Sequence, residues 1–501
     1  MAEETGSGAV EKKRDDELSR VPADTLTAVP EAASARLTWH GSDGASMDYV
    51  ARAGHVDVRS DAGALIGKMF ALSYAKVGKS GEPDAARPVT FCFNGGPGSC
   101  SVPINFGGIG PVRVPVEGVE HLAATAPAED NPHTLLVQSD LVFLDALGTG
   151  WSQLAEGVDT KKAWGVDADA DCFARAIAAW LEGNGRWGSP VYLFGESYGT
   201  VRNAVLMRLL AERGIQPTGV VMLSALFDWV QALPGQDLYF MGMVPTFAAA
   251  AQFHGRAGAG KDVDTWFDAA CAFAEGEFAT ALLRGDRLPA RQRAAVAKKL
   301  SRFIGLPQEL IERRNLRIDL DTFRRSLLAD EGLATGRLDT RFTADAPSTY
   351  QVSSLFFACE DAADDAIEGA YTAAFRAFVA RLGYKNPLPY LVNNYAKVAE
   401  AWDWGHEQPG SDDGKLPCAN VAHDIATALR RNTTCKLAIL GGRYDAATTY
   451  WNVEHDIACQ FLSPQARDRV EFHRYGCGHM AYTDEETCRA MAADMASFYA
   501  R

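Results

Sequence analysis

The sequence has no run of about 20 apolar residues, the length that a helix needs to cross a lipid bilayer. Its first 35 residues are charged and rich in small side chains, and they lack the apolar stretch found at the centre of a secretory signal. We therefore expect no transmembrane segment, a disordered leader over residues 1–35 and a cytoplasmic protein. The location would be periplasmic or secreted if a signal peptide has been removed.

Clustered positive charge is also missing. The 501 residues include 49 Lys and Arg against 64 Asp and Glu, and the formal net charge is −15. Nucleic acids and anionic membrane surfaces are held chiefly by clustered Lys and Arg, so we expect neither as the main partner. The ten cysteines include no C-x-x-C pair, which argues against a zinc site, and their disulfide pairing stays open. Nothing in the sequence indicates an oligomeric state.

The sequence does contain a large apolar fraction, 47% of all residues, arranged in strand-length segments. Two early segments, residues 47–60 and 63–78, alternate between apolar and polar side chains, which is typical of antiparallel strands with one exposed face. Later segments are continuous apolar runs, which indicate strands buried on both faces of a parallel sheet. These runs are residues 87–94, 140–146, 190–196, 219–225, 436–442 and 469–475.

Helix-length patterns lie between these runs, for example over residues 169–185 and 200–214. Strands that alternate with helices predict the α/β class, here a doubly wound, mostly parallel sheet with an antiparallel start, flanked by helices. Residues 229–430 interrupt the alternation with mostly helical patterns, and we expect a large, mainly helical cap insertion there. The core then has two parts, residues 36–228 and 431–501.

One buried run ends in the pentapeptide Gly195-Glu196-Ser197-Tyr198-Gly199, directly before a helical pattern. In this G-x-S-x-G pattern the glycines permit a sharp turn from strand to helix, and the turn lifts the serine hydroxyl above the carboxyl edge of the sheet. Five residues with three specified positions recur by chance, so the strand and helix on either side carry the argument. We predict that Ser197 is a nucleophile.

A serine nucleophile needs a histidine base and an acid that orients the histidine, and with such an elbow they follow in the chain order Ser, Asp, His. Asp445 comes just after the run at 436–442, and His479 lies in a glycine-flanked loop after the last run. Either residue alone is more often a turn residue or a solvated side chain. Because both stand in the expected order at strand ends, we predict that they are the partners of Ser197.

Acyl transfer also needs hydrogen-bond donors for a negatively charged oxygen. The glycine-rich segment at residues 93–101 follows the first continuous run, where such a fold places its first donor amide. The second donor is expected to be the amide of Tyr198, the residue after the nucleophile. An ordinary glycine turn is an equal alternative for the segment at 93–101 taken alone.

Four segments together resemble the serine carboxypeptidase family and its α/β-hydrolase fold. They are NGGPGS at 94–99, DALGTGWS at 145–152, GESYGT at 195–200 and GHMAY at 478–482, the last preceded by Asp445. The segment that ends in GESYGT resembles bacterial members in particular. The resemblance covers residues 85–230 and 430–500, whereas the cap resembles the family only in its position and helical character.

Carried onto this sequence, the resemblance implies Ser197 as the nucleophile, His479 as the base and Asp445 as the residue that orients it. It implies the amides of Gly96 and Tyr198 as the oxyanion donors. These assignments agree with those made from the residues themselves. The mechanism that they imply requires no metal and no organic cofactor.

The resemblance also implies a site for the terminal carboxylate of a substrate, formed by Asn94 and Glu196, and a leaving-group pocket lined by Met480. A buried Glu196 that keeps its proton would donate a hydrogen bond to that carboxylate. Alternatively, Glu196 caps the elbow or pairs with Arg202, and Met480 serves packing alone. Eukaryotic members carry a second Glu that shares this proton, and Gly108 stands in its place here.

The resulting hypothesis is a serine-type carboxypeptidase that hydrolyses the C-terminal peptide bond of a peptide with a free C-terminus. An esterase or acyltransferase that uses the same triad is the first alternative, because Gly108 puts the carboxylate site in question. The second alternative is a catalytically silent binding protein of the same fold.

Overall fold

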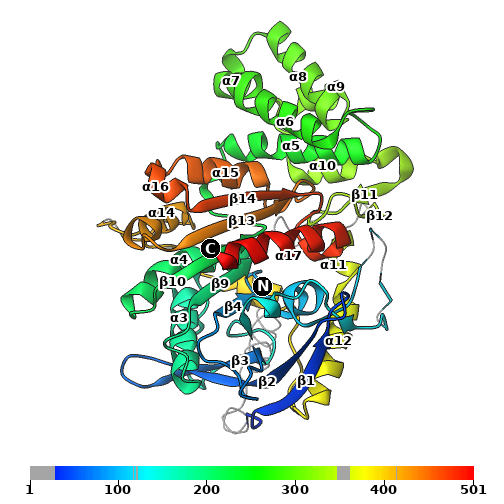
Figure 1. Ribbon diagram of the computed structural model, residues 1–501. Coiled ribbons are helices and arrows are strands. Elements are labelled where there is room, and N and C mark those ends of the chain that lie inside the picture. Colours follow the sequence, from blue (N-terminus) through cyan, green and yellow to red (C-terminus); the bar gives the residue numbers. More distant parts are fainter. Residues whose placement is uncertain (1–28, 117, 120–121, 124, 347–360, 413) are drawn as a thin grey trace, which may run out of the picture.

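The structure, a computed structural model, describes residues 29–501 apart from residues 117, 120–121, 124, 347–360 and 413. Its centre is a ten-stranded sheet with the strand order β1-β2-β3-β7-β4-β9-β10-β13-β14, and β8 pairs with β3 beside this path. Figure 1 shows helices on both sides of the sheet and a further group of helices at one end of the molecule. Residues 1–28 of the expected leader lie outside the described residues.

The sheet is antiparallel at its start and parallel afterwards. The pairs β1–β2, β2–β3 and β3–β7 are antiparallel, whereas β7, β4, β9, β10, β13 and β14 pair in parallel. The predicted fold class is therefore confirmed. The strands are β1 Ala33–His40, β2 Ser46–Arg59, β3 Leu65–Lys76, β4 Val89–Phe93, β7 Asp140–Leu144, β8 Gln153–Leu154, β9 Val191–Glu196, β10 Pro217–Leu223, β13 Lys436–Gly442 and β14 Val470–Tyr475.

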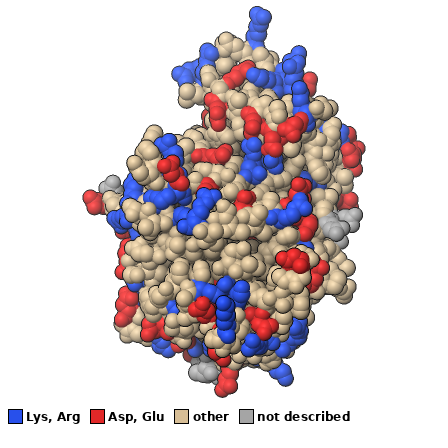
Figure 2. All heavy atoms as spheres, in the orientation of Figure 1, with Lys and Arg blue, Asp and Glu red and all other residues tan. Residues whose placement is uncertain are grey.

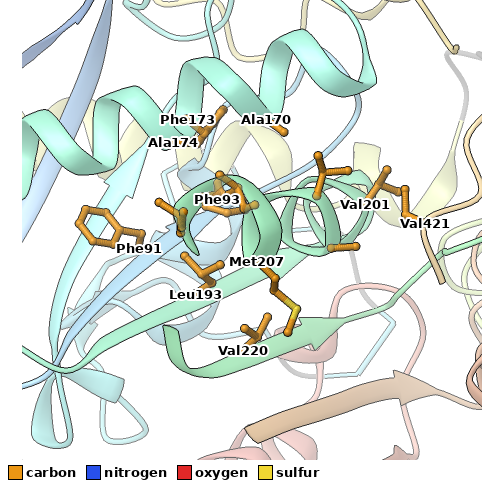
Figure 3. Close-up of a cluster of buried hydrophobic side chains, with 14 of the residues drawn as sticks. Phe91, Phe93, Ala170, Phe173, Ala174, Leu193, Val201, Met207, Val220 and Val421 are labelled. Atoms are coloured by element: carbon orange, nitrogen blue, oxygen red, sulfur yellow. The ribbon is translucent and has the colours of Figure 1, made fainter. Parts of the chain in front are cut away.

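The central strands are continuous apolar runs because both of their faces are covered. All five residues of β4 are buried, and successive side chains point to opposite faces. Phe91 and Phe93 pack into the cluster on one face with Phe173, while Cys92 packs into the cluster on the other. Figure 3 shows the first cluster, where strand side chains such as Phe91 and Phe93 meet helical side chains such as Phe173.

Different helices cover the two faces. The cluster that holds Phe91 includes side chains of α3 Val166–Gly183, α4 Tyr198–Glu212, α14 Ala422–Arg431 and α15 Tyr450–Ala458. The cluster that holds Cys92 includes side chains of the π-helical segment η1 Pro103–Ile109, of α12 Glu368–Arg381 and of α17 Glu485–Ala500. Both faces of the sheet are thus shielded, as a parallel sheet requires.

The stretch expected as a cap packs in more than one place. Its first helices form their own apolar cluster, centred on residues such as Phe247 and Phe323, whose rings stack 3.8 Å apart. In contrast, α12 and α14 join the two faces of the sheet. The limits 229–430 remain a prediction. The helices of the separate cluster are α5 Leu238–Phe253, α6 Val263–Phe273, α7 Ala279–Arg284, α8 Ala290–Ile304, α9 Gln308–Arg313 and α10 Leu320–Ser326, followed by the strand pair β11 Leu333–Thr335 and β12 Thr343–Asp345.

The surface carries charges of both signs. On the face in Figure 2, Lys and Arg side chains lie among Asp and Glu side chains. None of the described helices combines the length and the apolar content that a bilayer crossing demands.

Candidate active site

The nucleophile elbow lies between β9 and α4, as the sequence predicts. Ser197 has φ 58° and ψ −128°, a conformation in which a non-glycine residue is strained. Its backbone amide donates a 3.0 Å hydrogen bond to the carbonyl of Leu223 at the end of β10. A Cβ on Gly195 would lie only 2.3 Å from the Gly199 carbonyl oxygen, so this turn requires glycine there.

Asp445 follows β13 and His479 follows β14, the two strands beyond β10 in the sheet, and the two side chains lie in contact. The Oδ2 atom of Asp445 is 2.8 Å from Nδ1 of His479, and both side chains are buried. The other oxygen, Oδ1, accepts hydrogen bonds of 2.9 Å from the amides of Ala447 and Thr448. With both oxygens occupied, the carboxylate has a single orientation and presents Oδ2 to the imidazole.

The pKa of His479 reflects two opposing effects. Burial lowers it, because the charged imidazolium loses solvation, but the charge of Asp445 and its hydrogen bond raise it more. The net effect is a pKa above the ordinary value of histidine. The arrangement therefore stabilises an imidazolium, the form that a base adopts once it has taken a proton.

Ser224 links the two loops, and sequence reasoning missed it. Its hydroxyl donates a hydrogen bond to the backbone carbonyl of His479, and its own carbonyl accepts a 2.9 Å bond from the Thr448 hydroxyl. Ser224 is the first residue after β10 and has φ 50°. The sequence offered one signal for Ser224, its position at the end of the strand that pairs with the elbow strand. Its hydrogen-bond partners could not be predicted, because they lie more than 200 positions away in the sequence.

The glycine segment lies against the start of α4. A Cβ on Gly95 would lie 2.4 Å from the amide nitrogen of Tyr198, so the two backbones approach closely. Tyr198 is the first residue of α4, and the first amides of a helix have no partner within the helix. Gly96 follows with φ 108°. The structure thus brings the two predicted donors, Gly96 and Tyr198, to one corner of the elbow.

Glu196 is buried beside His479, with 2% of its surface exposed. Its Oε1 accepts a 3.0 Å hydrogen bond from the hydroxyl of Tyr482, and the Asn94 side chain lies close enough to lower the pKa of this carboxyl. Burial raises the pKa of Glu196 to about 7, although His479 and the hydrogen bonds lower it in part. Among the described residues, Oε2 has no hydrogen-bond partner.

A model of the serine carboxypeptidase family matches residues 45–214, from the start of β2 to just beyond α4. Over this range the chain is similar to serine carboxypeptidases. The resemblance is thereby confirmed for the three motifs inside this range, and so is the prediction of a serine hydrolase, whereas the motif at 478–482 lies outside the match. Family and fold together indicate a peptidase.

A solved structure with a TM-score above 0.5 supports the shared fold. A prohormone-processing carboxypeptidase from Saccharomyces cerevisiae aligns with a TM-score of 0.52 and 13% identity, over 96% of this chain and 95% of that one. A proline iminopeptidase from Mycobacterium smegmatis aligns with a TM-score of 0.36 and 12% identity, over 89% of this chain and 99% of that one. No curated protein sequence matches the chain.

Near the candidate site, Arg202 supports the backbone rather than Glu196. Its Nε donates to Asp169 Oδ2 at 2.6 Å, and another guanidinium nitrogen donates to the Asn94 carbonyl at 3.0 Å. The guanidinium also lies 4.1 Å from the centre of the Phe173 ring. The alternative partner considered for Glu196 is thus engaged elsewhere.

Replacing Arg202 with methionine is expected to lower the free energy of unfolding by about 3–5 kcal/mol, because Asp169 would be left as an unpaired buried charge. Urea unfolding measures this loss. The double variant that also carries Asp169→Asn should regain part of it. A loss of less than about 1 kcal/mol in the single variant would contradict the importance of this ion pair.

Met480 is buried, with 4% of its surface exposed, and packs in the cluster that contains Cys477 and Tyr482. Its role in a leaving-group pocket stays a prediction. Within the described ranges, no three His, Cys, Asp or Glu side chains come together as a metal ion would require.

Two segments from the predicted insertion lie over the loops of the candidate site. The carbonyl of Leu338, between β11 and β12, accepts a 2.7 Å hydrogen bond from the amide of His479. The amide of Asn394 donates a 2.8 Å bond to the carbonyl of Gly98, and Cys100 donates to the carbonyl of Val392. The insertion therefore contributes to holding both the histidine loop and the glycine loop.

Proposed function

We propose that this chain is a serine-type carboxypeptidase that hydrolyses the C-terminal peptide bond of peptides through an acyl-enzyme. The observation that carries the proposal is the buried contact of 2.8 Å between Asp445 Oδ2 and His479 Nδ1, at the same edge of the sheet as the strained Ser197. A histidine held in this way keeps its other nitrogen, Nε2, free to accept a proton.

In the first half of the reaction, Nε2 of His479 takes the proton of Ser197, and the serine Oγ forms a bond to the carbonyl carbon of the last peptide bond. The carbonyl electrons move to the oxygen, which accepts hydrogen bonds from the amides of Gly96 and Tyr198. Collapse of this intermediate breaks the carbon–nitrogen bond. The leaving amine takes the proton from His479, and the terminal amino acid departs.

In the second half, water replaces the amine. His479 takes a proton from the water, whose oxygen attacks the acyl carbon, and the same two amides hold the oxyanion. The bond to Ser197 then breaks, and Oγ regains a proton from His479. The products are the shortened peptide and the free amino acid, and no cofactor is consumed.

Recognition of the terminal carboxylate falls to Asn94 and Glu196. A protonated Glu196 donates a hydrogen bond to a carboxylate, whereas an ionised one repels it. Because the pKa of Glu196 is raised to about 7, the carboxyl keeps its proton in mildly acidic solution, and carboxylate binding is strong there. Binding is lost as the pH rises through the pKa.

An N-blocked dipeptide with a free carboxylate is expected to be cleaved in preference to its C-terminal amide. Its KM should rise about tenfold for each pH unit above a pH of about 7, while the KM of the amide stays level. Steady-state kinetics with both substrates between pH 5 and pH 9 measure this difference.

The matched control is Glu196→Gln, which retains a hydrogen-bonding side chain but cannot ionise. In this variant the KM of the free acid should lose its dependence on pH. If the parent protein cleaves acid and amide equally, or cleaves only simple esters, the triad serves another acyl substrate and the esterase or acyltransferase alternative holds. If no substrate is cleaved and a fluorophosphonate does not label Ser197, the alternative of a catalytically silent binding protein holds.

A further inference from the structure

The space beside Gly108, where the resemblance places the second family carboxyl, is filled by an aromatic ring. A Cβ on Gly108 would lie 3.0 Å from Cδ1 of Tyr482, and a Cβ on Gly107 would lie 2.5 Å from Cδ2 of the same ring. The ring therefore lies directly against this part of η1, with 2% of the tyrosine exposed. A glutamate at position 108 and a tyrosine at position 482 would compete for the same space.

The hydroxyl of this ring reaches Glu196. The 3.0 Å hydrogen bond ends on Oε1, whereas Oε2 is buried without a partner among the described residues. The other titratable groups that act on Glu196 are His479 and Asp445. Tyr371, from α12, packs against Tyr482 with the ring centres 6.1 Å apart, and its own pKa is raised by burial and by Glu196. Tyr482 thus holds the Glu196 carboxyl in place through Oε1, and Oε2 stays available to a ligand.

We propose that Tyr482 is the positioning residue of the carboxylate site: it holds Glu196 by Oε1, so that Oε2 carries the proton to the terminal carboxylate of the substrate. This inference rests on the proposed carboxypeptidase function. A phenol differs from a second carboxyl in one respect that matters, because it does not ionise between pH 4 and pH 9. Carboxylate binding then follows the titration of one carboxyl rather than that of a coupled pair.

The direction of the hydrogen bond decides what removal of the hydroxyl does. A donor stabilises the ionised form of the carboxyl that accepts from it, so Tyr482 lowers the pKa of Glu196 against the effect of burial. Without this donor, Glu196 keeps its proton to higher pH. The substrate carboxylate then stays bound to higher pH as well.

Tyr482→Phe removes the hydroxyl and leaves the ring against Gly108. We expect the pH at which the KM of the free-acid dipeptide begins to rise to increase by about one to two units, because a hydrogen bond to a charged group is lost. Hydrolysis of an ester without a carboxylate should change less than about threefold at any pH, since Ser197 and His479 are untouched.

The matched control is Tyr371→Phe. This ring is fully buried next to Tyr482, and its hydroxyl has no hydrogen-bond partner in the part of the chain that the structure describes. In this variant, the pH dependence of the KM for the free-acid dipeptide should coincide with that of the parent protein. A second test variant, Gly108→Ala, introduces a Cβ that displaces the Tyr482 ring, and it should move the profile in the same direction as Tyr482→Phe.

Two results would overturn the inference, and they differ. In the first, the parent protein prefers the free acid, but neither Tyr482→Phe nor Gly108→Ala shifts the pH dependence of its KM to higher pH. This result would disprove the role of Tyr482 and leave the carboxypeptidase function intact. In the second, the parent protein shows no preference for the free acid. This result would disprove both the proposed function and the carboxylate site.

Discussion

Replacing Ser197 with alanine is expected to lower kcat by about 10⁶-fold, because the acyl-enzyme can no longer form. The strained backbone at this position, φ 58°, and the placement of the side chain between β9 and α4 present the hydroxyl at the edge of the sheet. Initial rates with the free-acid dipeptide measure the loss. Covalent labelling by a fluorophosphonate should disappear in the same variant.

A suitable control is Ser189→Ala. Ser189 is a buried serine just before β9, and its hydroxyl donates to the Ala85 carbonyl, far from the proposed chemistry. This variant should keep the activity and the labelling of the parent protein. If Ser197→Ala retained more than about a tenth of the parent kcat, Ser197 would not be the nucleophile.

The variant Asp445→Asn is expected to lower kcat by about 10⁴-fold. The amides of Ala447 and Thr448 donate to Oδ1, so the asparagine would place its carbonyl oxygen there and its NH₂ group toward His479. A donor facing Nδ1 holds the imidazole with its proton on Nε2. That nitrogen then cannot accept the proton of Ser197.

Measuring kcat and KM of Asp445→Asn across a pH range tests both the loss of kcat and its explanation by the wrong tautomer of His479. The wrong tautomer lowers kcat without raising the KM of the free-acid dipeptide, since Asn94 and Glu196 are unchanged. A loss of less than about tenfold would show that His479 is oriented by other contacts, such as the hydrogen bond between the Ser224 hydroxyl and the His479 carbonyl.

The strands were predictable because their environment is uniform along their length. Each inner continuous run, such as the one at 190–196, became a strand with both faces covered, since only apolar side chains suit two buried faces. The run at 469–475 was expected to be buried on both faces as well, but its strand, β14, lies at the edge of the sheet and is only partly buried. The elbow was predictable for a local reason. Gly195 and Gly199 pack so closely that no other residue fits, and the strand and helix on either side are adjacent in sequence.

The partners of the predicted site residues were not predictable in the same way. Thr448 and Ser224 connect the Asp445 and His479 loops, and neither stands in a distinctive sequence pattern. The insertion was expected as one cap, yet α12 packs on the sheet and α5 belongs to a separate cluster. Helical periodicity shows that a helix has an apolar face, but it does not show which surface that face meets.

By itself, the sequence determined the α/β class and the positions of the buried strands and of the nucleophile elbow along the chain, because buried strands and tight glycine turns depend on neighbours along the chain. The tertiary structure alone decided how Glu196 is held. The ring of Tyr482 occupies the space above Gly108, and its hydroxyl reaches a carboxyl 286 positions away. That contact depends on the paths of η1 and of the loop after β14, which no local pattern encodes.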